Sequence, residues 1–356
     1  MNSGDKSLAI DIVEVGGSGG VFQHSLAVSV ALGQIGHSVR LHTSTEPEFS
    51  DPRVEVVSCF EWFRSVGRAR NVLIVWFFLV RTIPHVMRCP GQVWIQGSFK
   101  PLLTLLMMVG LRAMGRRVIF SPHTLFTRHG GRLDQALLNL CVKVSSEVVV
   151  YNSSDFDRLS RRRGGVSLAP LLMYTPVVSA GVEDYWRARI REMGAQVCSI
   201  GQIRTDKNLP MLVRAAAAAG TPLLVVGADA GGAAALQREV LNVPEGSCSL
   251  VIEYLPLEDL AAIVALVGTV ALPYSIASSS AVAVLAQAYG SRVLAHSVGG
   301  LAGQADVIVQ SLSDADWAEA IGSNASKAWD GRIPSPKGPS QPELRQLLAI
   351  VKGLPT

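Results

Sequence analysis

The chain has 356 residues, of which 49% are apolar and 17% are charged, and its formal net charge is +4. This length exceeds the usual size of one domain, and the composition excludes a disordered chain, so we expect two packed domains. The basic residues are not interleaved with stacking aromatic residues as in a groove for single strands, which argues against a nucleic-acid partner.

The cysteines contain no Cys-x-x-Cys pair, and they stand at positions 59, 89, 141, 198 and 248. This scatter predicts neither a metal site nor a disulfide framework, and it fits a reducing, cytoplasmic location. The N-terminus shows no secretory signal pattern. The longest apolar run, Val72 to Val80, is far shorter than the roughly 20 residues of a membrane-spanning helix.

Short apolar runs alternate with helical patterns through the first half of the chain. The predicted strands cover Leu8 to Val15, Val39 to Thr43, Val54 to Val57, Val93 to Gln96, Val118 to Ser121 and Val148 to Tyr151. Such alternation predicts a parallel sheet with helices on both faces, as in Rossmann-like domains.

The same rhythm restarts after a basic and polar interruption. The second set of predicted strands covers Val197 to Ile200, Leu223 to Val226, Leu250 to Glu253, Val270 to Leu272 and Val293 to Ala295. We therefore expect an α/β fold with two Rossmann-like, doubly wound parallel-sheet domains that face each other across a cleft.

The expected domain boundaries follow from this rhythm. The first domain covers residues 1–176, a hinge covers 177–194, and the second domain covers 195–331. Residues 332–356 are predicted as a Pro- and Gly-rich linker that leads to a terminal amphipathic helix. This helix could pack back on the first domain. Because ligands bind at the carboxyl ends of parallel strands, candidate sites are expected directly after the strands.

The first candidate site is the turn Gly16-Gly17-Ser18-Gly19-Gly20, which follows the first strand and opens a helix. Its glycines let backbone approach a ligand, and its N–H groups at a helix start suit an anion. Phe22 stands at the last glycine of the dinucleotide fingerprint, and the second strand ends without an acidic residue for a ribose. A plain tight turn explains these residues equally well.

The second candidate site is the stretch from Gly201 to Asn208, which reads Gly-Gln-Ile-Arg-Thr-Asp-Lys-Asn. Arg204 and Lys207 stand three residues apart before a helix, so both cations can converge on one anion, such as a diphosphate leaving group. Two cations at a helix start are also common on solvated surfaces.

The third candidate site is the turn Ser278-Ser279-Ser280, which lies between a strand and a helix of small residues. Hydroxyl groups and free N–H groups at a helix start suit phosphate oxygens. Serine is also an ordinary N-cap residue, so a structural role stays open.

The order of these motifs resembles the retaining GT-B glycosyltransferases of the glycosyltransferase family 4 type, along nearly the whole chain. The motifs that carry the resemblance are the glycine turn, Gly201 to Asn208, Val225 to Gly227, Pro273-Tyr274 with the three serines, and Gly299-Gly300-Leu301. The resemblance implies an acceptor-side first domain and a second domain that binds a nucleotide sugar.

The resemblance also implies roles for single residues. Gly201, Arg204 and Lys207 would hold the donor diphosphate, and Ser278, Ser279 and Ser280 would meet the phosphates or the sugar. The turn residues Gly17, Ser18, Gly19 and Gly20 would lie near the donor phosphate and the acceptor. His123, in Phe-Ser-Pro-His-Thr, would face the transferred sugar, although a lone histidine after a strand is more often structural.

The chain departs from this family at three positions. Ala277 and Leu285 stand where the family often carries two glutamates, of which the second usually binds a ribose. Gln202 stands where many members have arginine. These departures leave room for an inactive homologue.

The activity that the resemblance implies is transfer of a sugar from a nucleotide diphosphate sugar to an acceptor hydroxyl, by an enzyme of the hexosyltransferase type. Retention of configuration is expected, and no metal is implied, because two cations can neutralise the diphosphate. No cofactor beyond the donor substrate is expected. The product would belong to polysaccharide, glycolipid or other glycoconjugate biosynthesis.

The acceptor stays open at this point. The apolar stretch from Leu102 to Arg117 ends in arginines, and residues 158–163 add four more. A basic and apolar face would suit a lipid-linked acceptor and peripheral contact with the inner membrane surface. Buried helices with basic ends are commoner, and soluble sugar or small-molecule acceptors are equally open.

Three other functional classes stay open. A sugar-nucleotide epimerase would use the same diphosphate site, but it needs acid and base carboxylates that the sequence does not supply in evident places. A nicotinamide-dependent oxidoreductase would explain the glycine turn and leave Arg204 and Lys207 unused. A non-catalytic homologue or partner subunit would explain the missing glutamates.

Overall fold

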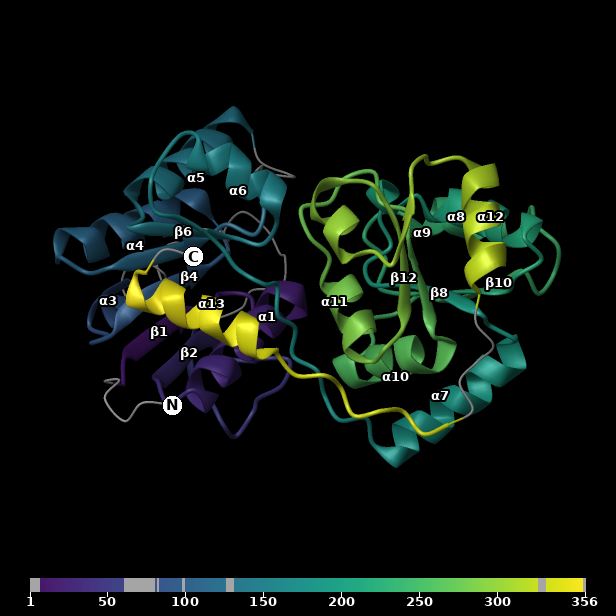
Figure 1. Ribbon diagram of the computed structural model, residues 1–356, viewed down its shortest axis with the longest axis horizontal. Coiled ribbons are helices and arrows are strands. Elements are labelled where there is room, and N and C mark those ends of the chain that lie inside the picture. Colours follow the sequence, from purple (N-terminus) through teal and green to yellow (C-terminus); the bar gives the residue numbers. More distant parts are fainter. Residues whose placement is uncertain are drawn as a thin grey trace. The chain divides into compact units, whose positions relative to one another are not determined.

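The computed structural model describes residues 7–60, 81, 83–97, 100–125, 131–325 and 331–354. The chain divides into two compact units (Figure 1): unit 1 is Met1–Tyr174 with Pro339–Thr356, and unit 2 is Thr175–Gly338. Each unit contains one parallel sheet flanked by helices. This arrangement confirms the predicted α/β class with two Rossmann-like domains. The apolar run Val72 to Val80 lies outside the described residues.

Unit 1 has a seven-stranded sheet in which each described pair of neighbours is parallel. In sheet order its strands are β3 (Glu55–Phe60), β2 (Ser38–Ser44), β1 (Ala9–Val13), β4 (Gln92–Gln96), β5 (Val118–Ser121), β6 (Glu147–Val150) and β7 (Val166–Leu168). Its described helices are α1 (Gly19–Gln34), α3 (Ile83–Met87), α4 (Pro101–Ala113), α5 (Arg132–Val144), α6 (Ser153–Ser160) and α13 (Gln341–Lys352).

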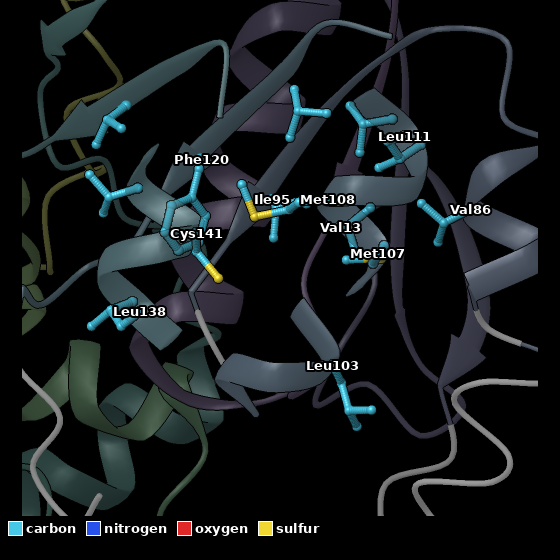
Figure 2. Packing of buried hydrophobic residues seen from close by; sticks show 14 of the residues in the cluster. Val13, Val86, Ile95, Leu103, Met107, Met108, Leu111, Phe120, Leu138 and Cys141 are labelled. Carbon is cyan, nitrogen blue, oxygen red and sulfur yellow. The ribbon is translucent and has the colours of Figure 1, made fainter. Parts of the chain in front are cut away.

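Alternate residues of the unit 1 strands enter two separate cores, as the period of two in a strand requires. On one face, Ile95 and Phe120 pack with Met107 and Met108 of α4 and with Leu138 of α5 (Figure 2). On the other face, the intervening residues of the same strands pack with α1 and α13. Because both faces are buried, the strands read as continuous apolar runs, and this made them predictable.

Unit 2 has a six-stranded sheet that is also parallel. In sheet order its strands are β10 (Cys248–Val251), β9 (Leu223–Val226), β8 (Val197–Ile200), β11 (Thr269–Leu272), β12 (Arg292–His296) and β13 (Val307–Val309). Its helices are α7 (Ala180–Met193), α8 (Leu209–Ala218), α9 (Ala233–Val240), α10 (Leu257–Val267), α11 (Ala281–Ala288) and α12 (Asp314–Asn324), with short 3-10 turns η2 (Thr205–Lys207) and η3 (Gly299–Gln304).

The segment that the sequence predicts as a hinge, residues 177–194, contains helix α7 and belongs to unit 2. Trp186 of α7 is 1% exposed, and its Nε1 donates to Asp259 Oδ1 of α10 at 2.7 Å. Gly194 ends the helix in the left-handed conformation that glycine adopts without strain. Helix α7 buries few of its side chains, such as Trp186 and Ile190. Most of its other residues face solvent, and the helix is therefore mostly polar.

The terminal helix α13 brings the end of the chain back to unit 1, where it lies beside α1 (Figure 1). Ser340 and Glu343 form a capping box at its start. At its end, Arg117 Nη2 donates to the carbonyl oxygen of Ile350 at 2.6 Å. The same guanidinium donates through Nη1 to the carbonyl oxygen of Val351 at 2.7 Å, one of the last carbonyls of the helix, which have no N–H four residues further on within the helix.

None of the helices in the described ranges has both the length and the apolar character that crossing a membrane requires.

Replacing Ile350 with alanine tests the docking of α13. Ile350 is fully buried, so Ile350→Ala is expected to cost about 2–5 kcal/mol of unfolding free energy through lost burial and a cavity. Leu354→Ala is the matched control, because Leu354 is 53% exposed and such surface changes stay within about 0.5 kcal/mol. Urea unfolding, monitored by circular dichroism, measures the stability of both variants. Equal urea midpoints for Ile350→Ala and Leu354→Ala would contradict the docking of α13.

Candidate functional site

The loop after β8 is held close to the end of β9 by two glycines. Gly201 has a φ of +97°, and a Cβ added at Gly227 would overlap the carbonyl oxygen of Gly201. Ile203 continues the pairing, because its N–H donates to the carbonyl oxygen of Ala228 at 2.8 Å. The glycines therefore allow a backbone contact that fixes the start of the loop carrying Arg204 and Lys207.

Lys207 is buried within this loop, with 6% of its surface exposed. Its Nζ donates to the carbonyl oxygen of Ile200 at 3.3 Å and lies 4.9 Å from the centre of the Tyr274 ring. A Cβ added at Gly201 would lie 3.0 Å from this Nζ. The ammonium group is thus held against the backbone by a cation–π contact and a hydrogen bond.

Arg204 is already engaged by a carboxylate. Its Nε and Nη2 donate to the two carboxylate oxygens of Asp206 at 2.8 and 2.9 Å, and its Nη1 lies 3.3 Å from Gln202 Oε1. This fork-to-fork pair is the geometry in which arginine binds carboxylate or phosphate most specifically. Arg204 was predicted from the sequence, whereas its partner Asp206 was not, although this Asp stands within Arg-Thr-Asp-Lys.

The serine turn is joined to the Lys207 loop. Asn208 Nδ2 donates to the carbonyl oxygen of Pro273 at 2.8 Å, and the N–H of Ser275 donates to the carbonyl oxygen of Asp206 at 2.9 Å. The structure therefore brings Gly201, Arg204 and Lys207 to the same sheet edge as the loop that leads to the three serines, within unit 2.

Ser280 is the N-cap of α11, and its Oγ accepts from the N–H of Ala283 at 3.3 Å. Its own N–H donates to Gln304 Oε1 at 2.8 Å. Gly300 donates to the carbonyl oxygen of Ser278 at 2.6 Å, and a Cβ at Gly299 would overlap the carbonyl oxygen of Ala277. The Gly-Gly pair is needed because its backbone packs directly on the serine turn.

Neither of the two positions where the resembling family often has a glutamate carries a carboxylate in this chain. Leu285 is 2% exposed and packs inside the domain, and Ala277 lies in the turn itself. A nucleotide ribose would therefore need other partners here than a glutamate.

The glycine turn of unit 1 is filled by the chain's own carboxylates. Glu14 accepts from the N–H groups of Gly16 and Gly17 at 2.6 and 2.9 Å, and Glu48 Oε2 accepts from the N–H of Gly19 at 3.1 Å. Burial raises the pKa of the Glu14 carboxyl, although these donors oppose the shift. An anion bound at these N–H groups would have to displace both glutamates.

His123 follows β5 in unit 1, and its φ of +58° is unusual for a residue other than glycine. Its Nε2 lies 2.9 Å from Gln96 Oε1 of β4, and its ring stacks on Tyr151 with centroids 4.9 Å apart. Burial, with His24 adding a smaller effect, lowers the pKa of His123 well below its usual value, so the ring is neutral at pH 7. Sequence reasoning missed the supporting residues Gln96, Tyr151 and His24, which lie on separate elements.

A group that could ligate a metal lies elsewhere in unit 1. The group consists of His42, His85 and Cys89. Each of these residues offers one ligand atom, and the three atoms lie within 4.8 Å of one another. His42 Nε2 and the guanidinium of Arg40 both bind Asp11 Oδ1. The arginine cation at this carboxylate opposes a second cation, and the sequence spacing had predicted no metal site.

Two glycines of the unit 1 turn form a matched test of its geometry. Gly17 and Gly19 have φ values of +69° and +71°, so alanine at either position costs about 1–2 kcal/mol. Gly17→Ala would also overlap Ser44 Cβ, whereas nothing lies within 4 Å of a Cβ at Gly19. Gly17→Ala is expected to lose about 1–3 kcal/mol more in urea unfolding, and an equal loss would mean that this packing is wrong.

Comparison with known proteins gives matches at the level of structure. No family model and no curated protein matches the sequence. Sucrose-phosphate synthase from Thermosynechococcus elongatus matches with a TM-score of 0.67 and 16% identity, over 98% of this chain and 94% of that one. The catalytic domain of starch synthase IV from Arabidopsis thaliana, bound to ADP and acarbose, matches with a TM-score of 0.67 and 11% identity, over 97% and 95%.

A third solved structure, trehalose 6-phosphate synthase from Burkholderia multivorans, has a TM-score of 0.62 and 12% identity and covers 99% of this chain and 94% of that one. At these identities the likeness concerns the fold. It extends over both units, because each match covers nearly all of the chain. The chain therefore has the GT-B fold that its order of motifs implied.

Proposed function

We propose that this protein is a glycosyltransferase that transfers a sugar from a nucleotide diphosphate sugar to an acceptor hydroxyl. The observation that carries the proposal is the buried Lys207 beside Arg204, joined through Asn208 and Ser275 to the serine turn at the start of α11. Cations and a helix start at one sheet edge are suited to a diphosphate. The solved structure of starch synthase IV, which shares the fold, holds ADP.

In the proposed reaction, the acceptor oxygen forms a bond to the anomeric carbon as the bond from that carbon to the diphosphate breaks. Lys207 and Arg204 stabilise the negative charge that develops on the departing diphosphate. We propose retention of configuration, with the acceptor proton passing to the departing phosphate. Because two protein cations supply the neutralisation, the proposal needs no metal and no cofactor beyond the donor.

Asp206 sets the strength of this site. Its bidentate pair with Arg204 leaves the Arg204, Asp206 and Lys207 group with a net charge of +1, whereas two unpaired cations would offer +2. A diphosphate must therefore share or replace the Asp206 carboxylate at the guanidinium. We infer that Asp206 positions the arginine and weakens nucleotide binding, which would help product release.

A thermal-shift panel of UDP, GDP, ADP, dTDP and NAD tests the donor site. A nucleotide at a hundredfold excess over its dissociation constant stabilises the folded state by about 2.7 kcal/mol. We expect one nucleoside diphosphate to give this shift, the Arg204→Ala, Lys207→Ala double variant to lose it, and Asp206→Asn to increase it. Arg161→Ala is the control that should keep the shift, because Arg161 lies in unit 1.

The outcomes of this panel separate the alternatives. A shift with NAD alone would favour an oxidoreductase. A diphosphate shift without release of nucleotide in the presence of sugar donor and any tested acceptor would favour a non-catalytic homologue, which the Arg204–Asp206 pair and the buried Leu285 also fit. Turnover of the donor sugar without an acceptor would favour an epimerase.

We further propose a lipid-linked acceptor at an anionic membrane surface, reached by unit 1. Helix α4 exposes Leu102, Leu106 and Val109 in one row, with 52%, 44% and 47% of each exposed. Helix α6, which covers the same sheet face, carries the exposed Arg158 in its last turn and is followed by the exposed Arg161 and Arg162. Arg116, Arg117 and Arg163, by contrast, donate to backbone carbonyls within unit 1 and serve its structure.

Vesicle sedimentation tests this surface. We expect binding to vesicles of anionic phospholipid and much less to phosphatidylcholine vesicles, since each exposed arginine near the surface contributes about 1 kcal/mol. A Leu102→Ser, Leu106→Ser double variant should weaken binding about tenfold or more, because each side chain would bury apolar area in the interface. Leu241→Ser is the control, being 85% exposed on unit 2, and equal sedimentation on both lipids would overturn the proposal.

A further inference from the structure

A row of hydrogen bonds crosses the interior of unit 1, and one of its members, Tyr151, stacks on the ring of His123. Trp94 Nε1 lies 2.8 Å from Ser121 Oγ, and Ser121 Oγ lies 2.9 Å from Tyr151 Oη. Tyr151 Oη lies 2.9 Å from His24 Nε2, and His24 Nδ1 lies 2.8 Å from the carbonyl oxygen of Leu172. Trp94, Ser121 and His24 are fully buried.

The two ends of this row determine where each proton lies. An indole N–H can act as a donor alone, and a carbonyl oxygen as an acceptor alone. His24 must therefore donate through Nδ1, and burial lowers its pKa to about 4, so the ring is neutral at pH 7 and Nε2 is an acceptor. Tyr151 then gives its single proton to His24, and Ser121 gives its proton to Tyr151.

Gln96 lies next to the hydrogen-bonded row. Its side-chain amide ends beside both Tyr151 and His123, with Oε1 3.2 Å from Tyr151 Oη and 2.9 Å from His123 Nε2. Tyr151 has no second proton to give, so an amide oxygen there would face another oxygen. The Nε2 of Gln96 is meanwhile buried without a hydrogen-bond partner among the described residues. A half-turn of the amide exchanges its two ends and removes the oxygen–oxygen conflict.

We infer that Gln96 presents its NH2 group to both Tyr151 and His123, so that His123 accepts at Nε2 and carries its proton on Nδ1. The amide has two N–H groups, and the two neighbours offer one lone pair each. An Nε2 without a proton is consistent with the neutral ring that the lowered pKa of His123 indicates. Nδ1 of His123 makes no hydrogen bond to a residue that the structure describes, and the ring is partly exposed.

The proton on Nδ1 determines which hydrogen bonds His123 can make to a ligand, and a role toward a sugar rests on the proposed function. A neutral ring with its proton on Nδ1 donates a hydrogen bond to an electron-rich oxygen, such as a sugar hydroxyl oxygen, and does not abstract a proton through that nitrogen. Gln96, Tyr151 and His24 are positioning residues, because they act on the ligand through His123. The left-handed backbone of His123 keeps the ring in this place.

Nitrogen NMR of the full chain labelled with ¹⁵N-histidine tests the inference without a substrate. Protonated and bare ring nitrogens resonate far apart, and the His123 signals are identified by their loss in His123→Gln. We expect Nδ1 protonated and Nε2 bare at neutral pH. In Gln96→Leu the NH2 donor is gone, so the ring should relax to a mixture of both tautomers, while Gln34→Leu, at an exposed position on α1, should leave the signals unchanged.

A proton on Nε2 of His123 in the wild type, or a ring protonated at both nitrogens at neutral pH, would overturn the inference. The wild-type spectrum decides this even where Gln96→Leu does not fold. Because no donor or acceptor is present, the result is independent of whether the chain transfers sugar. Conversely, a failed nucleotide panel would reject the proposed function and leave the assignment of the His123 proton intact.

Discussion

The contact between Gly201 and Gly227 is the constraint on which the unit 2 site depends. Parallel strands β8 and β9 diverge after their last paired residues unless the backbones can touch, and a side chain at Gly227 would occupy the place of the Gly201 carbonyl oxygen. With this contact made, Ile203 donates to and accepts from the loop after β9. The Arg204 and Lys207 segment is thereby anchored before Arg204, and the bond from Asn208 to the carbonyl oxygen of Pro273 anchors it after Lys207. A buried ammonium group becomes tolerable because its partners are fixed beforehand.

The turn after the first strand carries carboxylates in unit 1 and cations in unit 2. Unit 1 fills its glycine turn with the carboxylates of Glu14 and Glu48, which use the N–H groups of Gly16, Gly17 and Gly19. Unit 2 places cations after its first strand instead. In the proposed reaction the donor diphosphate is therefore assigned to the second unit, because an anion at the first turn would compete with these carboxylates for the same N–H groups.

Most of the fold could be predicted because buried parallel strands are continuous apolar runs. The exceptions have physical reasons. Strands β7 and β13 have three residues each and lie at sheet edges, where so short a run shows no period, and β10 begins two residues before its predicted start. Helix α7 was hidden in the predicted hinge because its surface is mostly polar.

The candidate site was predictable where its residues are neighbours in sequence, and not where the sheet brings them together. Arg204, Lys207 and the serines stand in compact motifs. Gln96, Tyr151 and His24, by contrast, belong to three separate elements, and each alone resembles an ordinary polar residue at the end of a strand or within a helix. Asp206 was in view but its role was missed, because a sequence does not show which way a carboxylate points.

The buried polar row of unit 1 is costly, and this cost argues that it has a purpose. Ser121, Tyr151 and His24 lie beside a core whose other members, such as Ile119 and Val149, are apolar. Apolar residues in their place would avoid the desolvation of several polar groups. A row with every proton assigned gives instead a single arrangement, since reversing one bond would leave a buried donor facing a donor. In the inferred arrangement Tyr151 accepts from Gln96, whose amide also holds the ring of His123, and Nδ1 of His123 is left to donate to a ligand.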